Sequence, residues 1–271
     1  MTVKLYNDHF QNYKRYNMPK GQLVIADIPY NLSSSAYASS PSWYIGGDNK
    51  NGESELAGTE FFDTDKNFKP AEFMHFCSKL MKKEPKEAGE APAMIVFCSF
   101  EQQFYLIELA RKYGINNYLN LVFRKNFSAQ VLKANMRIVG NAEYGLLLYR
   151  DKLPKFRNHG KMIFNIIDWE SDDKNLLYEK IHPTQKPVKL IKKLIDIFTD
   201  EGDVVIDPVA GSGSTLVAAI QMHRKAYGFE IKKDFFAKAN EWIKRVESQA
   251  DLFKPVATRK DAEPKDMFIN A

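Results

Sequence analysis

The sequence predicts an α/β protein built on a mostly parallel sheet with helices on both faces. Short apolar segments of strand type alternate with amphipathic segments of helix type along most of the 271 residues. Parallel strands need a crossover connection, usually a helix, so this alternation favours a parallel sheet covered by helices. No internal repeat or linker divides the chain. We therefore expect one domain over residues 1–250 and a loose, charged tail over 251–271.

Seven short segments have the composition of buried or half-buried strands and are bounded by polar or turn residues. They are residues 3–6, 22–26, 93–98, 117–123, 143–149, 203–207 and 225–230. Helices are predicted between them, where apolar residues recur at helical spacing. These helices lie around Phe73–Leu80, over 101–113 and 188–198, from about Ser214, and around Phe235–Val246. The segment 188–198 has the cleanest amphipathic pattern, with Ile191, Leu194 and Ile195 on one side.

The composition excludes several classes of protein. The apolar runs are short and interrupted by charge, and the first residues lack the layout of a signal peptide. Cys77 and Cys98 lie in apolar surroundings without metal-ligand spacing, which favours buried, reduced thiols. We therefore expect a cytoplasmic protein without a metal site and without a membrane partner.

Positive charge is concentrated between residues 124 and 161. The net charge of the chain is only +5, but this stretch holds nine Lys or Arg residues against Glu143 and Asp151. Basic side chains interleaved with aromatic ones suit a surface that contacts nucleic-acid phosphates, whereas the alternative is a solvated face without a partner. The candidate DNA contacts are Arg124, Lys125, Lys133, Arg137, Lys155, Arg157 and Lys161.

A long polar segment, residues 31–66, separates the second predicted strand from the first long helix. It is rich in Ser, Gly, Asn and Asp, and it has no sustained periodicity. Irregular segments of this length in a domain are usually functional lids or disordered. The aromatic residues in it are too many for a plain linker, so we expect a lid-like loop. They are Tyr37, Trp43, Tyr44, Phe61 and Phe62.

Residues 203–215 run from an apolar strand through Asp207 into a glycine turn. Gly211 and Gly213 allow the backbone to turn sharply and to approach a ligand closely, and the helix that follows directs free N–H groups at it. Glu230 ends the next predicted strand, where a carboxylate can accept hydrogen bonds from ribose hydroxyls. The pattern favours a nucleoside-type cofactor; a tight turn without a ligand is the alternative.

The tetrapeptide Asp27-Ile28-Pro29-Tyr30 follows another apolar strand. A carboxylate and a backbone carbonyl can together accept the hydrogens of an aromatic amino group, which turns the nitrogen lone pair toward an incoming methyl group. Pro29 stiffens the turn, and Tyr30 offers a face on which a base can stack. A base inside a duplex must first be flipped out. Taken alone, the tetrapeptide is also compatible with a simple strand-ending turn.

Three motifs give the chain a resemblance to the DNA amino-methyltransferases. Residues 27–31 resemble their DPPYN motif, residues 207–215 resemble their DP-F-x-G-S-G-T cofactor motif, and residues 182–187 (HPTQKP) look like the segment that precedes the latter. The catalytic motif comes first, which is the permuted order of the β class. The resemblance implies a Rossmann-like S-adenosylmethionine-dependent methyltransferase fold with a seven-stranded sheet and circularly permuted motif order.

The resemblance also implies roles for individual residues. Asp27 and the carbonyl of Ile28 would hold the target amine, Pro29 would fix the turn, and Tyr30 would stack on the base. The cofactor, S-adenosylmethionine, would be bound by Asp8 near its adenine, by Asp27, by Thr184 and Lys186 at its carboxylate, by Asp207, Val209, Gly211, Gly213 and Ser214 along its methionine part, and by Glu230 at its ribose. The resemblance assigns no role to Glu143.

Two departures from the family pattern bear on function. Ile28 replaces the usual first proline, which makes the turn less rigid, and Val209 replaces a phenylalanine, which removes an aromatic wall against the cofactor. The family associates an acid at position 27 with N6-adenine and a serine with N4-cytosine. We therefore expect adenine as the target, with N4-cytosine as the alternative.

Double-stranded DNA is the partner that the resemblance implies. The segment about 150–181, where this class keeps target recognition, is short, so either the loop 31–66 shares the reading of DNA or a second subunit contributes. A homodimer and a cognate restriction endonuclease are further partners that this interpretation admits. An RNA amino-methyltransferase is an alternative, although such enzymes usually place the cofactor motif first. A binding module without catalysis would predict damaged motifs, which are intact here.

Overall fold

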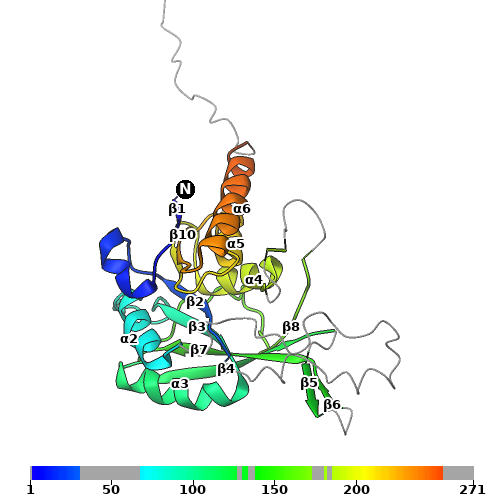
Figure 1. Ribbon diagram of the computed structural model, residues 1–271. Helices are drawn as coiled ribbons and strands as arrows, with labels where there is room; N and C mark the ends of the chain where they lie inside the picture. The colour runs from blue at the N-terminus through cyan, green and yellow to red at the C-terminus, as the bar shows by residue number, and fades with distance from the viewer. Residues whose placement is uncertain are drawn as a thin grey trace, which may run out of the picture.

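The computed structural model describes residues 2–30, 68–126, 130–133, 138–172, 180–181 and 185–252. Its main sheet has eight strands in the order β1-β10-β9-β2-β3-β7-β4-β8 (Figure 1). They are β1 (Val3–Tyr6), β2 (Leu23–Asp27), β3 (Ala93–Cys98), β4 (Asn117–Arg124), β7 (Ala142–Tyr149), β8 (Ile166–Asp168), β9 (Val204–Asp207) and β10 (Lys225–Phe229). The predicted loop 31–66, Arg137 and Thr184 lie outside the described residues.

All seven predicted strands are confirmed, but the main sheet has eight strands, so the predicted number of seven is wrong. The eighth strand, β8, pairs parallel with β4 at the edge of the sheet. The strand β8 is three residues long, and its first residue, Ile166, is 53% exposed. The strand therefore has no pattern of alternating buried residues that the sequence could reveal. The sheet is mixed, because β7 runs antiparallel to both β3 and β4, while the other neighbours pair parallel.

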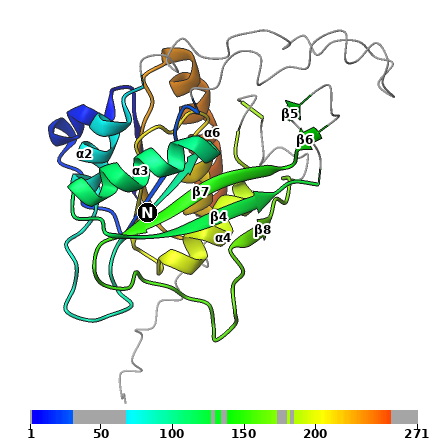
Figure 2. The ribbon, with the colours of Figure 1, turned by 90° about the horizontal axis from the view of Figure 1, so that it is seen from below.

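A small hairpin stands apart from the main sheet. β5 (Gln130–Lys133) pairs antiparallel with β6 (Ile138–Gly140) between β4 and β7 in the chain. Both views show it projecting from the end of these two long strands, away from the helices (Figures 1 and 2). The hairpin extends the basic stretch beyond the body of the sheet.

Helices cover both faces of the sheet, as predicted (Figure 2). One face packs against the 3-10 helix η1 (Phe10–Tyr16), α2 (Pro70–Leu80) and α3 (Phe100–Lys112). The other packs against α4 (Val188–Phe198), α5 (Ser214–Gln221) and α6 (Lys233–Leu252), and the fully buried Trp242 belongs to this second core. The helix α6 runs two residues into the segment predicted as a tail. Within the described ranges, no helix is both long and apolar enough to cross a membrane.

The strand order creates a switch point between β9 and β2. From β2 the chain continues outward to β3, whereas from β9 it continues in the opposite direction to β10. The helices that follow the two strands lie on opposite faces, since α2 belongs to one core and α5 to the other. Open α/β sheets bind ligands in the crevice at the carboxyl ends of such strands. Asp27 and Asp207 are the last residues of β2 and β9.

A network of ion pairs ties the segment after β7 to the amino ends of the central strands. Lys155 is 8% exposed, and its Nζ lies 2.8 Å from Asp203 Oδ2, just before β9. Arg157 pairs with Asp200 at 2.7 Å and with Glu90 at 2.8 Å. Lys155 and Arg157 therefore stabilise the fold at the amino ends of the central strands, opposite to Asp27. Their contact with DNA stays a prediction.

We expect Asp203→Asn to lower the free energy of unfolding by about 2–4 kcal/mol, because Lys155 and Lys82 lose a largely buried partner. Burial alone would raise the pKa of Asp203, but hydrogen bonds from Lys155, the Asp200 amide and Lys82 lower it below the ordinary value. The contribution is therefore complete above the pKa of an unfolded aspartate and lost as the pH falls through the lower, folded pKa. Urea unfolding at several pH values checks this: the difference between wild type and variant should narrow below about pH 4. A constant difference would contradict it.

Candidate active site

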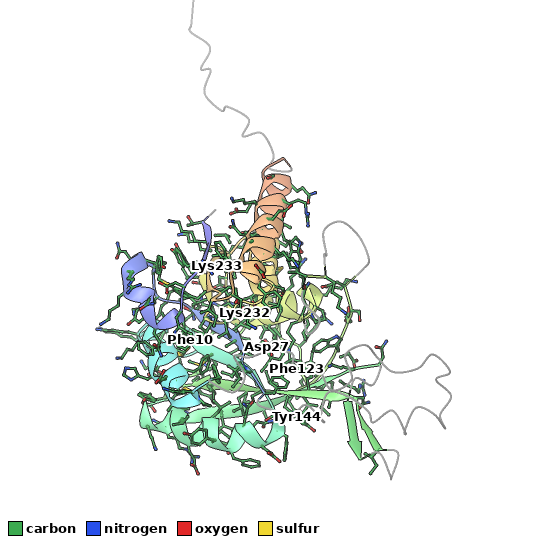
Figure 3. The ribbon with its side chains drawn as sticks, in the orientation of Figure 1. Phe10, Asp27, Phe123, Tyr144, Lys232 and Lys233 are labelled. Atoms are coloured by element: carbon green, nitrogen blue, oxygen red, sulfur yellow. The ribbon has the colours of Figure 1, made fainter. Side chains whose placement is uncertain are left out.

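Three carboxylates gather at the carboxyl ends of adjacent central strands. Asp27 ends β2, Asp207 ends β9, and Glu230 directly follows β10. Asp207 and Glu230 are 4% and 8% exposed. Figure 3 shows Asp27 near the middle of the molecule, with Tyr144 and Phe123 on the β7–β4 side. The sequence placed these three acids in separate motifs, and the fold brings them to one edge.

Asp207 is a buried acid whose pKa is raised. Its Oδ1 accepts a hydrogen bond from the Val209 amide at 3.1 Å. Burial raises its pKa to about 7; the hydroxyl of Thr215 and the Val209 amide oppose the shift, and the charges of Asp27 and Glu230 add to it. A carboxylate held in this way is stabilised by a cationic or hydrogen-bond-donating ligand, and strongly shifted groups are typical of functional sites.

Glu230 is oriented by the backbone of the glycine turn. Its Oε2 accepts from the Gly211 amide at 2.9 Å, and its Oε1 accepts from the Lys232 amide at 2.7 Å. Burial raises the pKa of Glu230, and these amides oppose the shift. Because each carboxylate oxygen has further lone pairs, the fixed carboxylate can accept additional hydrogen bonds from a ligand.

The glycine turn is left-handed at both predicted positions. Gly211 has φ 52° and Gly213 has φ 80°, a region that side chains with a Cβ rarely adopt. A Cβ on Gly211 would meet no heavy atom of the described residues within 4 Å, so this side of the turn is open. A Cβ on Gly213 would instead press on Ile243 and Ala239 of α6. Ser214 begins α5 and is buried.

Asp8 lies beyond β1, where it organises η1. Its Oδ1 accepts from Asn12, and its Oδ2 accepts from the Tyr16 hydroxyl, both at 2.7 Å. The Tyr16 ring stacks on Tyr6 with ring centroids 4.0 Å apart. Next to it, the Asn7 side chain donates to the Glu230 carbonyl at 2.8 Å, which links this turn to the end of β10. Asp8 therefore lies near the carboxylate edge, with its own oxygens engaged locally.

The turn after β2 is held by a residue that the sequence did not indicate. Ile28 is 2% exposed, and its amide donates to the Phe97 carbonyl at 3.3 Å. The Gln102 side chain donates from Nε2 to the Pro29 carbonyl at 2.8 Å. Its Oε1 accepts from the Ser99 amide and completes a capping box at the start of α3. Ile28 stands where the family pattern has its first proline, so that proline does not stiffen the turn here. The hydrogen bond from Gln102 restrains the turn instead.

Gln102→Glu should separate the two tasks of Gln102. A glutamate can still accept from the Ser99 amide, but it cannot donate to the Pro29 carbonyl, so we expect turnover to fall about tenfold with little change in melting temperature. Ser99→Ala is the matched control, since it weakens the helix cap by about 0.5–2 kcal/mol without touching the turn. Equal turnover by Gln102→Glu and wild type would show that the tether is unimportant.

Behind Asp27 lies a chain of four alternating charges, which we call the buried charge chain: Asp27, Lys186, Glu143 and Lys125. Lys186 is 6% exposed, and its Nζ lies 2.6 Å from Asp27 Oδ2 and 3.2 Å from Glu143 Oε2. Lys125 donates to the other oxygen of Glu143 and lies over the Trp169 ring, 4.6 Å from its centroid. Lys125, with 11% of its side chain exposed, is therefore part of this chain, and its contact with a DNA phosphate stays a prediction.

The buried charge chain stabilises the charged forms of Lys186 and Glu143. Burial would lower the pKa of Lys186, but Asp27 and Glu143 outweigh it and raise the pKa. Burial would raise the pKa of Glu143, but Lys186 and Lys125 lower it. Asp27 lies deep in the protein although 32% of its side chain stays accessible; burial raises its pKa, and Lys186 offsets the shift only in part. Lys186 therefore stays protonated and Glu143 stays ionised.

The remaining basic residues have different surroundings. Arg124 pairs with Asp168 of β8 at 2.7 Å on an exposed part of the sheet edge. Lys161 is exposed, and Lys133 lies in β5. Among the predicted DNA contacts whose side chains the structure describes, Arg124 and Lys161 are exposed and Arg157 is partly exposed.

A comparison with protein families decides which class of protein this is. Residues 22–241 match the profile of the N6/N4 DNA methylases, which covers the sheet from β2 to β10 and all three carboxylates. The chain belongs to this family of DNA methylases.

Relatives of known name point to the same class. The protein named 'Putative methylase YubD' of Escherichia coli strain K12 is 26% identical over 207 residues, which cover 76% of this chain and 80% of YubD. The DNA adenine methyltransferase YhdJ of the same organism is 36% identical over 96 residues, 35% of this chain and 32% of YhdJ. The second match therefore spans about a third of that relative.

Solved structures show the same fold at low sequence identity. The M1.HpyAVI–SAM complex aligns with a TM-score of 0.60 at 20% identity, covering 89% of this chain and 100% of that one. The cytosine-N4-specific PvuII DNA methyltransferase aligns with a TM-score of 0.60 at 15% identity, covering 92% and 93%. The predicted Rossmann-like methyltransferase fold is confirmed.

Proposed function

We propose that this DNA methylase transfers a methyl group from S-adenosylmethionine to the N6 amino group of adenine in double-stranded DNA. The observation that carries the proposal is the position of Asp27 and Asp207 on either side of the switch point. A carboxylate suited to hold an amine thus ends the strand next to the one that begins the glycine turn. Methyl transfer requires the donor and the acceptor to meet in line, and neighbouring strand ends can bring them together.

The chemistry of the site fits this cofactor. S-adenosylmethionine carries a sulfonium, an ammonium, a carboxylate and two ribose hydroxyls. Asp207 and Glu230 are buried carboxylates with raised pKa values, and the turn at Gly211 is open on one side. Glu230 would accept from the ribose hydroxyls, and Asp207, with the backbone from Val209 to Ser214, would hold the methionine part. When bound, the cofactor supplies an electrophilic methyl group.

The residues of the turn after β2 would prepare the amine. The lone pair of an exocyclic amine is delocalised into the ring, which makes the nitrogen a poor nucleophile. Asp27 and the carbonyl of Ile28 would each accept one amine hydrogen and direct the lone pair out of the ring plane. The ionised Asp27 also stabilises the positive charge that develops on the nitrogen, before a proton leaves to water. Tyr30 would stack on the flipped base.

Adenine is favoured over cytosine as the target. The acid at position 27 resembles the N6-adenine pattern, and the relative YhdJ is named as an adenine methyltransferase. N4-cytosine is the second candidate, because an enzyme of that specificity shares the fold. DNA would be contacted by Arg124 and Lys161 at the surface, with the loop 31–66, Lys133 and Arg137 as further candidates. Thr184 would contact the cofactor carboxylate. A homodimer and a restriction endonuclease partner belong to this proposal as well.

Nucleoside analysis tests the proposal. The purified protein is incubated with methyl-labelled S-adenosylmethionine and bacterial genomic DNA, and the digested nucleosides are separated by mass spectrometry. Labelled N6-methyldeoxyadenosine is the expected product. Labelled N4-methyldeoxycytidine would keep the mechanism and overturn the choice of base, whereas label in RNA but not in DNA would overturn the substrate.

A further inference from the structure

The carboxylate of Glu143 reaches the proposed active site from a strand that runs the opposite way to its neighbours. Because β7 is antiparallel, its first residues, rather than its last, lie beside the carboxyl ends of β3 and β4; Tyr144 is paired with Cys98, and Glu143 with Phe123. The Glu143 side chain is 16% exposed. It therefore lies beside the ion pair of Lys186 and Asp27 without belonging to any of the three methyltransferase motifs.

Glu143 contacts Lys186 and Tyr30, the two residues on either side of the place proposed for the base amine. Its Oε2 lies 3.2 Å from Lys186 Nζ and 3.4 Å from the Tyr30 hydroxyl, which donates to it. The Lys186 ammonium also lies 5.4 Å from the centre of the Tyr30 ring. Lys125 neutralises the remaining oxygen of Glu143. One carboxylate thus holds both the ammonium next to Asp27 and the ring proposed to stack on the base.

The contact between Lys186 and Asp27 conflicts with the proposed reaction. An ammonium 2.6 Å from Asp27 Oδ2 takes up part of the capacity of this carboxylate to accept hydrogen bonds. It also opposes the positive charge that develops on the amine nitrogen during methyl transfer, and in surroundings this buried the repulsion is poorly screened. Productive binding of the amine therefore requires the ammonium to have another anionic partner within reach. Besides the cofactor carboxylate that the resemblance assigns to Lys186, the structure supplies Glu143.

We propose that Glu143 is a positioning residue that retains the Lys186 ammonium when the base amine occupies Asp27. The inference rests on the proposed methyl transfer. The Lys186 ammonium lies between the carboxylates of Asp27 and Glu143 and pairs with both. A small movement of the ammonium would break its ion pair with Asp27 and keep the one with Glu143. The hydrogen bond from Tyr30 to the same oxygen couples this movement to the stacking face. Glu143 does not touch the transferred methyl group; it acts through Lys186 and Tyr30.

Glu143→Gln is the central variant, because glutamine keeps the shape and removes the charge. We expect kcat for DNA methylation at saturating cofactor to fall by up to about 10²-fold, and the Kd for S-adenosylmethionine to stay within about twofold. Glu170→Gln is the matched control: Glu170 also pairs with a lysine, Lys193, but on the surface, and kcat should not change. A wild-type kcat for Glu143→Gln overturns the proposal, as does a loss of cofactor binding that matches the loss of activity.

A double-mutant cycle separates positioning from mere stabilisation of the fold. In a Lys186→Met background there is no ammonium to retain, so Glu143→Gln should cost little further activity. Fully additive losses overturn the proposal. If Glu143→Gln alone fails to fold, the double variant Glu143→Gln/Lys125→Met takes its place, because it removes one charge of each sign. The cycle then combines this double variant with Lys186→Met. Wild-type protein that methylates no DNA base refutes the proposed function itself, which is a different result from an active wild type with an unaffected variant.

Discussion

Asp27→Ala is expected to lower the rate of methyl transfer by at least about 10²-fold while the affinity for S-adenosylmethionine changes only a few-fold. The carboxylate lies at the end of β2, and its accessible face is the one proposed to receive the amine. Removing it leaves the amine with one acceptor, the carbonyl of Ile28, so the nitrogen lone pair stays delocalised. Single-turnover kinetics on DNA and calorimetric titration with the cofactor measure the two quantities separately.

Asp27→Asn is the control for shape. An asparagine can still accept one hydrogen bond, but it cannot balance the positive charge of the amine, nor that of Lys186 at 2.6 Å. We therefore expect Asp27→Asn to be impaired nearly as strongly as Asp27→Ala. Near-normal turnover by either variant would show that Asp27 does not hold the amine.

Glu230→Ala should raise the Kd for S-adenosylmethionine by about 10- to 100-fold, because hydrogen bonds to a charged group are worth about 1.5–3 kcal/mol each. The variant also frees the amides of Gly211 and Lys232, which the carboxylate holds in place, so the glycine turn loses an anchor. At saturating cofactor the rate should recover most of its wild-type value, since Glu230 does not face the amine.

Glu241→Ala is the matched control for Glu230→Ala. Glu241 is an exposed residue of α6, so its loss removes the same charge from the protein without touching the glycine turn. Its cofactor affinity should equal that of the wild type. An unchanged Kd in Glu230→Ala would refute the ribose role, and an equal loss in both variants would assign the effect to overall charge.

The parts of the fold that sequence predicts well are those that local pattern determines. The seven predicted strands carry apolar runs that end in turn residues, and the helix Val188–Phe198 has the bounds that its periodicity indicates. Gly211 and Gly213 have the left-handed backbone that only their residue type adopts readily. The missed strand β8 has neither length nor alternation, because it lies at an edge where little is buried.

The contacts that could not be predicted from the sequence join residues that lie far apart along the chain. Lys155 and Arg157 look like surface charge until the fold places Asp203 and Asp200 beside them. Glu143 reaches Lys186 only because β7 runs antiparallel, and Gln102 reaches Pro29 across 73 residues of sequence. Counting charges in a segment therefore does not show which of them are paired within the fold, and motifs alone do not place Glu143 or Gln102 beside the proposed active site.

The most direct test of the account is long-read sequencing of genomic DNA from cells that express the protein, compared with cells that express Asp27→Ala. Methylated adenines are expected within one short sequence context in the first DNA, and none at those positions in the second. Modified N4-cytosine in the same comparison would contradict the choice of base. Identical DNA from the two strains would contradict the central claim that this site methylates DNA.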